Sequence, residues 1–195
     1  YEDKDFKLID AVQQQLDEGK IKIYCPDSID TLSWYNKDVH PAVRVKNHRW
    51  YEQMIKKEII ETALEETGFD KIVVAGCSFG GYHAANLAFR HPELVSHLFC
   101  MSGAYDMSGQ LDGFYNDDVY YNSPLDFLPH NNHPDLWKLK IALGTAEHDI
   151  CRADNERLST ILSRKGIDHW LDIRPDSSHD WLIWRQMFND YINQL

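Results

Sequence analysis

Apolar residues recur along the chain in two patterns, and the two patterns alternate. Apolar positions three and four residues apart predict amphipathic helices, whereas short continuous apolar runs predict buried strands. The first pattern predicts helices over residues 5–18, 50–64, 79–90, 158–165 and 181–192. The second predicts strands over 21–25, 72–75, 98–101, 138–143 and 170–173. This alternation is typical of an α/β fold, a mostly parallel sheet flanked by helices.

The run at 72–75 is apolar at every position, and this predicts a central parallel strand buried on both faces. Gly19, Gly68 and Gly166 each follow a predicted helix, where glycine suits a helix end.

Between residues 104 and 137 the alternation lapses, and aromatic residues mix with Asp, Asn and Pro. Because an insertion after the carboxyl end of a strand lies over the ligand site in such folds, we predict a lid-like insertion within a single domain spanning 1–195. An ordinary surface connection with a small apolar cluster of its own is the alternative interpretation.

Composition narrows the classes of partner. The chain has 195 residues, 43% of them hydrophobic, which suits one globular domain with a sizeable core. Its net charge of -11 argues against nucleic acid or an anionic membrane as a partner. No apolar run approaches the roughly 18 residues of a membrane span, and no signal peptide is visible. The scattered cysteines form no C-x-x-C pair, which predicts free thiols and a cytoplasmic location. A homo-oligomer is left open.

The first candidate catalytic residue follows shortly after the apolar run at 72–75. Ser78 lies between Gly76 and Gly80, and a helical pattern follows at once. Strand, tight turn and helix form the context in which G-x-S-x-G presents a nucleophilic serine above a parallel sheet. Gly76 is expected to permit the tight turn, and Gly80 and Gly81 to let the helix approach the sheet. The backbone N–H of Phe79 is then a candidate oxyanion-hole donor.

A serine hydroxyl needs a base to take its proton, and the base needs an acid to orient it. Asp149 and His179 follow two later predicted strands, each about six residues beyond the predicted strand end, in the order serine, acid, histidine. Glu147 and Asp106 are alternative acids. The plainer interpretations are a turn serine at Ser78 and a helix-capping surface histidine at His179.

Four segments resemble an esterase family of the α/β-hydrolase superfamily, which includes esterase D, feruloyl and acetyl esterases, enterochelin esterases and mycolyltransferases. They are GCSFGGYHAAN at 76–86, MSGAYD at 101–106, GTAEHD at 144–149 and SHDW at 178–181. The resemblance covers nearly the whole chain. It implies an α/β-hydrolase fold with Ser78 as nucleophile, His179 as general base and acid, and Asp149 as the orienting acid.

The chain departs from this family at its beginning. Members have further strands before the first helix, and a loop after one of them carries the second oxyanion N–H. We therefore expect an N-terminally truncated domain, with an absent strand that would lie between 21–25 and 72–75.

The leading hypothesis is a serine esterase that cleaves a small-molecule carboxylic ester through an acyl-enzyme and needs no cofactor. An acyltransferase on the same triad and a non-catalytic binding module are the alternatives. No metal is expected, because the spaced pair His130 and His133 has no evident third ligand. Trp34 and Tyr35 either line the substrate pocket or are plain packing residues.

Overall fold

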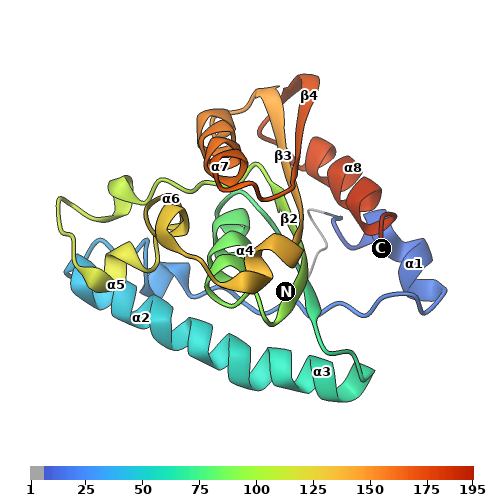
Figure 1. Ribbon diagram of the computed structural model, residues 1–195, viewed down its shortest axis with the longest axis horizontal. Coiled ribbons are helices and arrows are strands. Elements are labelled where there is room, and N and C mark those ends of the chain that lie inside the picture. The colour runs from blue at the N-terminus through green and yellow to red at the C-terminus, as the bar shows by residue number, and fades with distance from the viewer. Residues whose placement is uncertain (1–6) are drawn as a thin grey trace.

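The computed structural model describes residues 7–195, and a four-stranded parallel sheet lies at their centre (Figure 1). Its strands are β1 (Ile72–Cys77), β2 (Val95–Met101), β3 (Lys140–His148) and β4 (Trp170–Ser178). They lie side by side in chain order, and each neighbouring pair is parallel. Their carboxyl ends therefore meet at one edge of the sheet, where open α/β folds carry their ligand sites. The predicted α/β class is confirmed.

Helices cover both faces of this sheet (Figure 1). Because side chains alternate along a strand, Leu98 and Cys100 of β2 face a core shared with α4 (Phe79–Arg90) and α7 (Arg152–Lys165). Phe99 and Met101 face a second core, which α8 (Trp181–Ile192) covers.

The remaining helical elements are shorter or lie outside these layers. α2 (Pro41–Met54) runs through a π-helical segment (Ile55–Ile60) into α3 (Glu61–Thr67). Short helices are α1 (Gln13–Asp17), α5 (Asp117–Tyr120) and α6 (Pro124–Phe127). Single 3-10 turns cover Asp10–Val12, Asp30–Leu32, Ser108–Gln110, Leu128–His130 and Pro134–Lys138.

The predicted helices at 79–90 and 181–192 are confirmed at both ends. The first predicted helix is shorter than expected: a 3-10 turn leads into α1, and residues 5 and 6 lie outside the described residues. The long helix begins at Pro41, well before residue 50. Its start signals are a proline at the first position and the His40 side chain, which accepts a hydrogen bond from the Ala42 N–H.

The predicted strand at 21–25 is wrong. This segment pairs with no strand of the described chain, although Ile21 and Ile23 pack against the core under α8. Alternate burial imitates a strand pattern, but a strand also requires a neighbouring backbone to exchange hydrogen bonds with.

The prediction that 72–75 is central and buried on both faces is also wrong for the described sheet. β1 lies at its edge, and Val73 is 37% exposed. An apolar run indicates that a strand tends to be buried. It does not identify which element of the fold buries it. A strand beside β1 stays a prediction.

The stretch 104–137 contributes buried apolar side chains to the main core beside α4 and α7. Among them are Met107, Leu111, Val119 and Leu128. The alternative of a separate small cluster is therefore wrong for these residues, and the role of the stretch as a lid stays a prediction.

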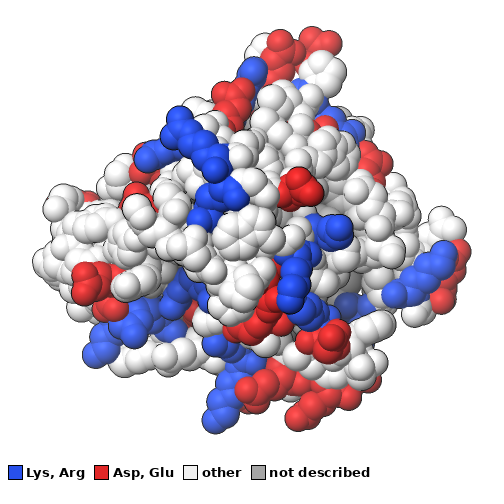
Figure 2. All heavy atoms as spheres, viewed as in Figure 1, with Lys and Arg blue, Asp and Glu red and all other residues white. Residues whose placement is uncertain are grey.

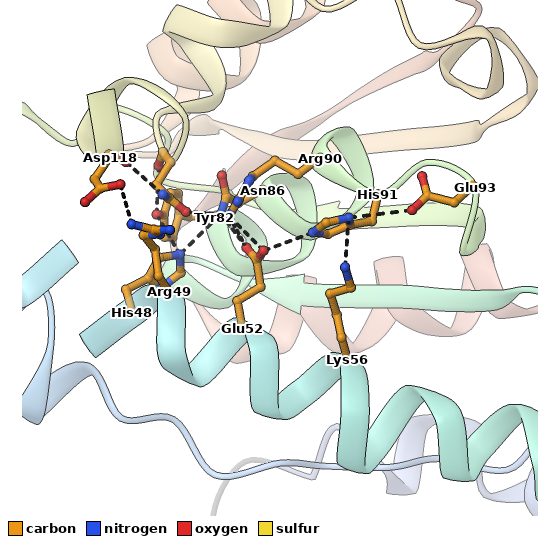
Figure 3. Close-up of polar contacts among 11 residues, drawn as sticks. His48, Arg49, Glu52, Lys56, Tyr82, Asn86, Arg90, His91, Glu93 and Asp118 are labelled. Carbon is orange, nitrogen blue, oxygen red and sulfur yellow. Dashed lines mark hydrogen bonds and ion pairs between the residues drawn. The ribbon is translucent and has the colours of Figure 1, made fainter. Parts of the chain in front are cut away.

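A buried polar network joins α2 to α4 (Figure 3), and Asn122 extends it to the turn between α5 and α6. We call it the Glu52 network, and its members are His48, Glu52, Asn86, Arg90 and Asn122. Nη1 of Arg90 lies 2.7 Å from both carboxylate oxygens of Glu52 and donates to Oδ1 of Asn122 at 2.8 Å. The amide of Asn86 donates to Glu52 and Asn122, each at 3.1 Å. These bonds fix the far half of α4 to its surroundings.

Charged side chains of both signs are interspersed over the face of the molecule shown in Figure 2. This distribution accompanies the net charge of -11. Within residues 7–195, no helix combines the length and the apolar character needed to cross a membrane.

Candidate active site

The turn between β1 and α4 holds Ser78 in an unusual backbone conformation. Its φ of 53° and ψ of -120° lie outside the regions that non-glycine residues normally adopt. Backbone bonds hold it there: its N–H donates to Met101 O at 2.8 Å, and its carbonyl accepts from Gly81 N at 3.0 Å and from Ala104 N at 3.2 Å. Strain of this kind persists only where the surroundings enforce it, and it clusters at functional sites.

The glycines around Ser78 have different roles. A Cβ on Gly76 would lie 2.1 Å from Gly80 O, and a Cβ on Gly81 would lie 2.8 Å from the Cα of Gly103. Both positions therefore require glycine, Gly76 for the tight turn and Gly81 for the close approach of α4 to the sheet, as predicted. A Cβ on Gly80 would meet nothing within 4 Å, so the expectation that Gly80 serves packing is wrong: its missing side chain would point into open space.

Ser78, His179 and Asp149 form one continuous hydrogen-bonded chain. Nε2 of His179 lies 2.9 Å from Ser78 Oγ, and Nδ1 lies 2.8 Å from Asp149 Oδ1. The imidazole is 17% exposed, whereas the side chain of Asp149 is buried. This is the arrangement in which a carboxylate orients a histidine and the histidine accepts a proton from a serine.

Strand length decides how Asp149 and His179 reach Ser78. The sequence predicted that each residue lies about six residues beyond a strand, but β3 ends at His148 and β4 at Ser178. Both side chains therefore follow their strands directly, at the same edge of the sheet as Ser78. The shorter predicted strands are wrong because β3 and β4 continue to pair beyond their apolar runs, with a register shift between Ala146 and His148.

The carboxyl group of Asp149 remains ionised in its buried position. Burial raises its pKa, but hydrogen bonds from His179, from the Ser102 side chain and from the Cys151 backbone outweigh this effect and leave the pKa below its usual value. The Cys151 N–H donates to Oδ1 at 2.7 Å. Oδ2 is buried and has no partner with ordinary hydrogen-bond geometry.

His179 is held from two sides. The next residue, Asp180, caps α8 by accepting from the N–H groups of Leu182 and Ile183. The ring of Trp184 meets the imidazole edge to face, with 4.7 Å between ring centroids. The interpretation of His179 as the helix cap is therefore wrong, since Asp180 fills that role.

The two alternative acids are engaged elsewhere. Glu147 accepts from the backbone N–H of Asp176 at 3.1 Å. Asp106 accepts from the backbone N–H of Ser108 at 2.9 Å, and this bond is the main reason that its pKa is lowered. Asp149 is the acid that the structure brings to His179.

Phe79 is the first residue of α4, so its N–H has no acceptor within the helix. It adjoins Ser78 in the chain, where the predicted oxyanion donor belongs. Its ring packs against Tyr35, with centroids 4.7 Å apart, and Tyr35 is 46% exposed. Trp34 is fully buried against His48 and Tyr82 and is a packing residue. Tyr35 thus lies partly exposed beside the residue that follows Ser78, and its role in a substrate pocket stays a prediction.

Sequence reasoning missed Cys151, which it treated as one of four plain thiols. One ligand atom each from Asp149, Cys151 and His179 lies within 4.8 Å of the other two. Burial, with the charges of Asp149 and Asp154, raises the pKa of the Cys151 thiol to about 12. The thiol is therefore protonated and no rival to Ser78 as nucleophile. A cysteine two residues after the candidate acid was the only available signal.

Comparison with known proteins establishes the class. A model of the alpha/beta hydrolase fold family matches residues 48–165, more than half of the chain. The chain therefore belongs to the α/β hydrolases. None of the curated proteins compared with it matches.

Solved structures share the fold at low identity. A ferulic acid esterase is 16% identical with a TM-score of 0.66, over 96% of this chain and 76% of its own. S-formylglutathione hydrolase from Staphylococcus aureus is 20% identical with a TM-score of 0.52, over 76% of this chain and 61% of its own. The enterobactin esterase from Shigella flexneri is 22% identical with a TM-score of 0.55, over 74% of this chain and 38% of its own. The chain thus spans less than two thirds of the latter two proteins.

Proposed function

We propose that this protein is a serine esterase that cleaves a small-molecule carboxylic ester through Ser78, His179 and Asp149. The observation that carries the proposal is the continuous chain of hydrogen bonds from Asp149 Oδ1 through both nitrogens of His179 to Ser78 Oγ. The strained backbone of Ser78 and the esterases among the structural relatives support it.

In the proposed reaction, Ser78 Oγ attacks the ester carbonyl carbon while its proton passes to Nε2 of His179. Asp149 stabilises the imidazolium, and the N–H of Phe79 donates to the oxyanion. The tetrahedral intermediate collapses, and the alcohol leaves with the proton from His179. Water then attacks the acyl-serine with its proton passing to His179, and collapse releases the acid and returns the proton to Ser78. The described residues supply the nucleophile Ser78, the base His179, its acid Asp149 and one oxyanion donor, the N–H of Phe79.

We further propose a cytoplasmic location. The four cysteines are scattered along the sequence without a C-x-x-C pair, and this usage suits a reducing compartment.

The test is covalent labelling combined with turnover. The protein is treated with a fluorophosphonate, the labelled residue is identified by mass spectrometry, and hydrolysis of short p-nitrophenyl esters is measured. We expect label on Ser78, and Ser78→Ala should lose the label and roughly 10³-fold or more in kcat/KM. Ser163→Ala, at an exposed serine of α7, is the matched control and should keep both. Unchanged ester hydrolysis by Ser78→Ala would contradict the proposal.

A further inference from the structure

Cys151 presents its side chain to the candidate site but has no part in the proposed reaction. Its sulfur belongs to the group of three potential ligand atoms, all within 4.8 Å of one another, that it forms with Asp149 and His179. The three residues come from the ends of β3 and β4 and from the start of α7, so the fold holds them together.

We propose that Asp149, Cys151 and His179 form an inhibitory Zn²⁺ site. A thiolate, an imidazole nitrogen and a carboxylate oxygen are the ligands that zinc prefers, and three protein ligands plus one water complete a tetrahedron. The inference rests on the proposed function, because inhibition requires a hydrolase to inhibit.

A second observation points to a cation at this place. Oδ2 of Asp149 is buried without a hydrogen-bond partner of ordinary geometry. A buried carboxylate oxygen in that condition costs free energy that a bound cation would recover. One thiolate and one carboxylate also balance the two charges of Zn²⁺, so the loaded site is neutral.

The required movement is small. Ligand atoms of a tetrahedral zinc lie about 3.3–3.6 Å apart, given Zn–S of about 2.3 Å and Zn–N of about 2.0 Å. The longest separation here is at most 4.8 Å, so side-chain rotations that close a gap of about 1 Å suffice.

The proposed inhibition follows from the histidine tautomer. Zinc bonds to Sγ of Cys151, to one oxygen of Asp149 and to Nδ1 of His179. The thiol releases one proton to solvent, and Nε2 takes up one proton from solvent in place of the one that leaves Nδ1, so the imidazole stays neutral. With Nδ1 occupied by the metal, the neutral imidazole carries its proton on Nε2. Nε2 then donates to Ser78 Oγ and no longer accepts its proton, so Ser78 is not activated.

The experiment titrates the intact protein with Zn²⁺ and with Co²⁺. We expect zinc to abolish ester hydrolysis and a chelator to restore it. Cys151→Ala should weaken inhibition by more than about 100-fold, since loss even of groups behind the ligands costs 10–100-fold in affinity. Cys25→Ala removes an exposed thiol and should leave inhibition unchanged. Inhibition is expressed relative to the metal-free activity of each variant.

Co²⁺ supplies a readout that does not depend on turnover. We expect a near-ultraviolet cobalt–thiolate band in the unaltered protein and in Ser78→Ala, but not in Cys151→Ala. Equal inhibition of Cys151→Ala, or a band that survives this substitution, would overturn the site. If no ester is ever hydrolysed but the Cys151-dependent band is present, the proposed function fails while the metal site stands.

Discussion

Two histidines lie beside opposite halves of α4, and their surroundings differ sharply. His179 approaches Ser78, which immediately precedes the helix, and is held between a nucleophile candidate and the carboxylate of Asp149. His48 lies farther along, fully enclosed in the Glu52 network (Figure 3), where Nε2 meets the Asn86 amide at 3.2 Å. Nδ1 of His48 has no hydrogen-bond partner.

Charge pairing explains the difference. Burial lowers the pKa of His48 well below its usual value, and its electrostatic interactions with His83 and Arg90 lower the pKa further. A carboxylate is near, but both oxygens of Glu52 are bound by Arg90. The comparison teaches that a buried histidine can serve in proton transfer only when a carboxylate is free to stabilise its charged form. His48 instead remains neutral and holds the fold together.

The largest expected effect is a difference in ester hydrolysis between variants of the two histidines. His179→Gln should lower kcat/KM roughly 10³–10⁶-fold with little change in melting temperature, because it removes the base. His48→Gln, the matched substitution, should lower the melting temperature and leave kcat/KM of the folded protein near that of the unaltered chain. Steady-state kinetics and thermal unfolding of both variants check this. Comparable losses of kcat/KM in the two variants would contradict the assignment of proton transfer to His179 and of a structural role to His48.

The next effect concerns the stability of the Glu52 network. Glu52→Ala should lower the free energy of unfolding by about 3 kcal/mol, because it leaves the Arg90 guanidinium without its carboxylate. Arg90 is 22% exposed, which keeps the loss at the low end for an ion pair of this kind. Urea denaturation measures it, and Glu61→Ala, at an exposed glutamate of α3, is the control. If the free energy of unfolding of Glu52→Ala equals that of the unaltered protein, the Glu52 network does not stabilise the fold.

The smallest effect is a dependence of stability on pH. His48 is neutral in the folded state and has an ordinary pKa of about 6.5 when unfolded, so below that pH the unfolded chain binds a proton that the folded chain does not. Unfolding free energy should therefore fall as pH drops below about 6.5, by about 1.4 kcal/mol per pH unit until the folded pKa is reached.

Urea denaturation between pH 7 and pH 5 tests this sign and size. His48→Gln should lose that component of the slope, whereas His130→Gln, at an exposed histidine, should keep it. Identical slopes in the unaltered protein and in His48→Gln would assign the pH dependence to other groups.

Local patterns predicted most of the regular elements. Apolar periodicity located α4 and α8 to the residue, and Gly68 and Gly166 mark helix ends in the left-handed conformation, as their flexibility allows. The patterns failed where a neighbour decides the outcome. Residues 21–25 have alternate apolar positions but no strand to pair with in the described chain, and β3 and β4 extend because each provides hydrogen bonds for the other.

The sequence by itself determined the α/β class, the turn that presents Ser78, and the chain order of Ser78, Asp149 and His179. These depend on local backbone preferences and on periodicity, which neighbouring residues encode. Tertiary structure alone decided that Asp149 rather than Glu147 or Asp106 meets His179, that Cys151 stands beside both, and that His48 lies in the Glu52 network. The physical reason is that hydrogen bonds and pKa values depend on distances of a few ångströms between segments far apart in the chain, and only the packed sheet and helices set those distances.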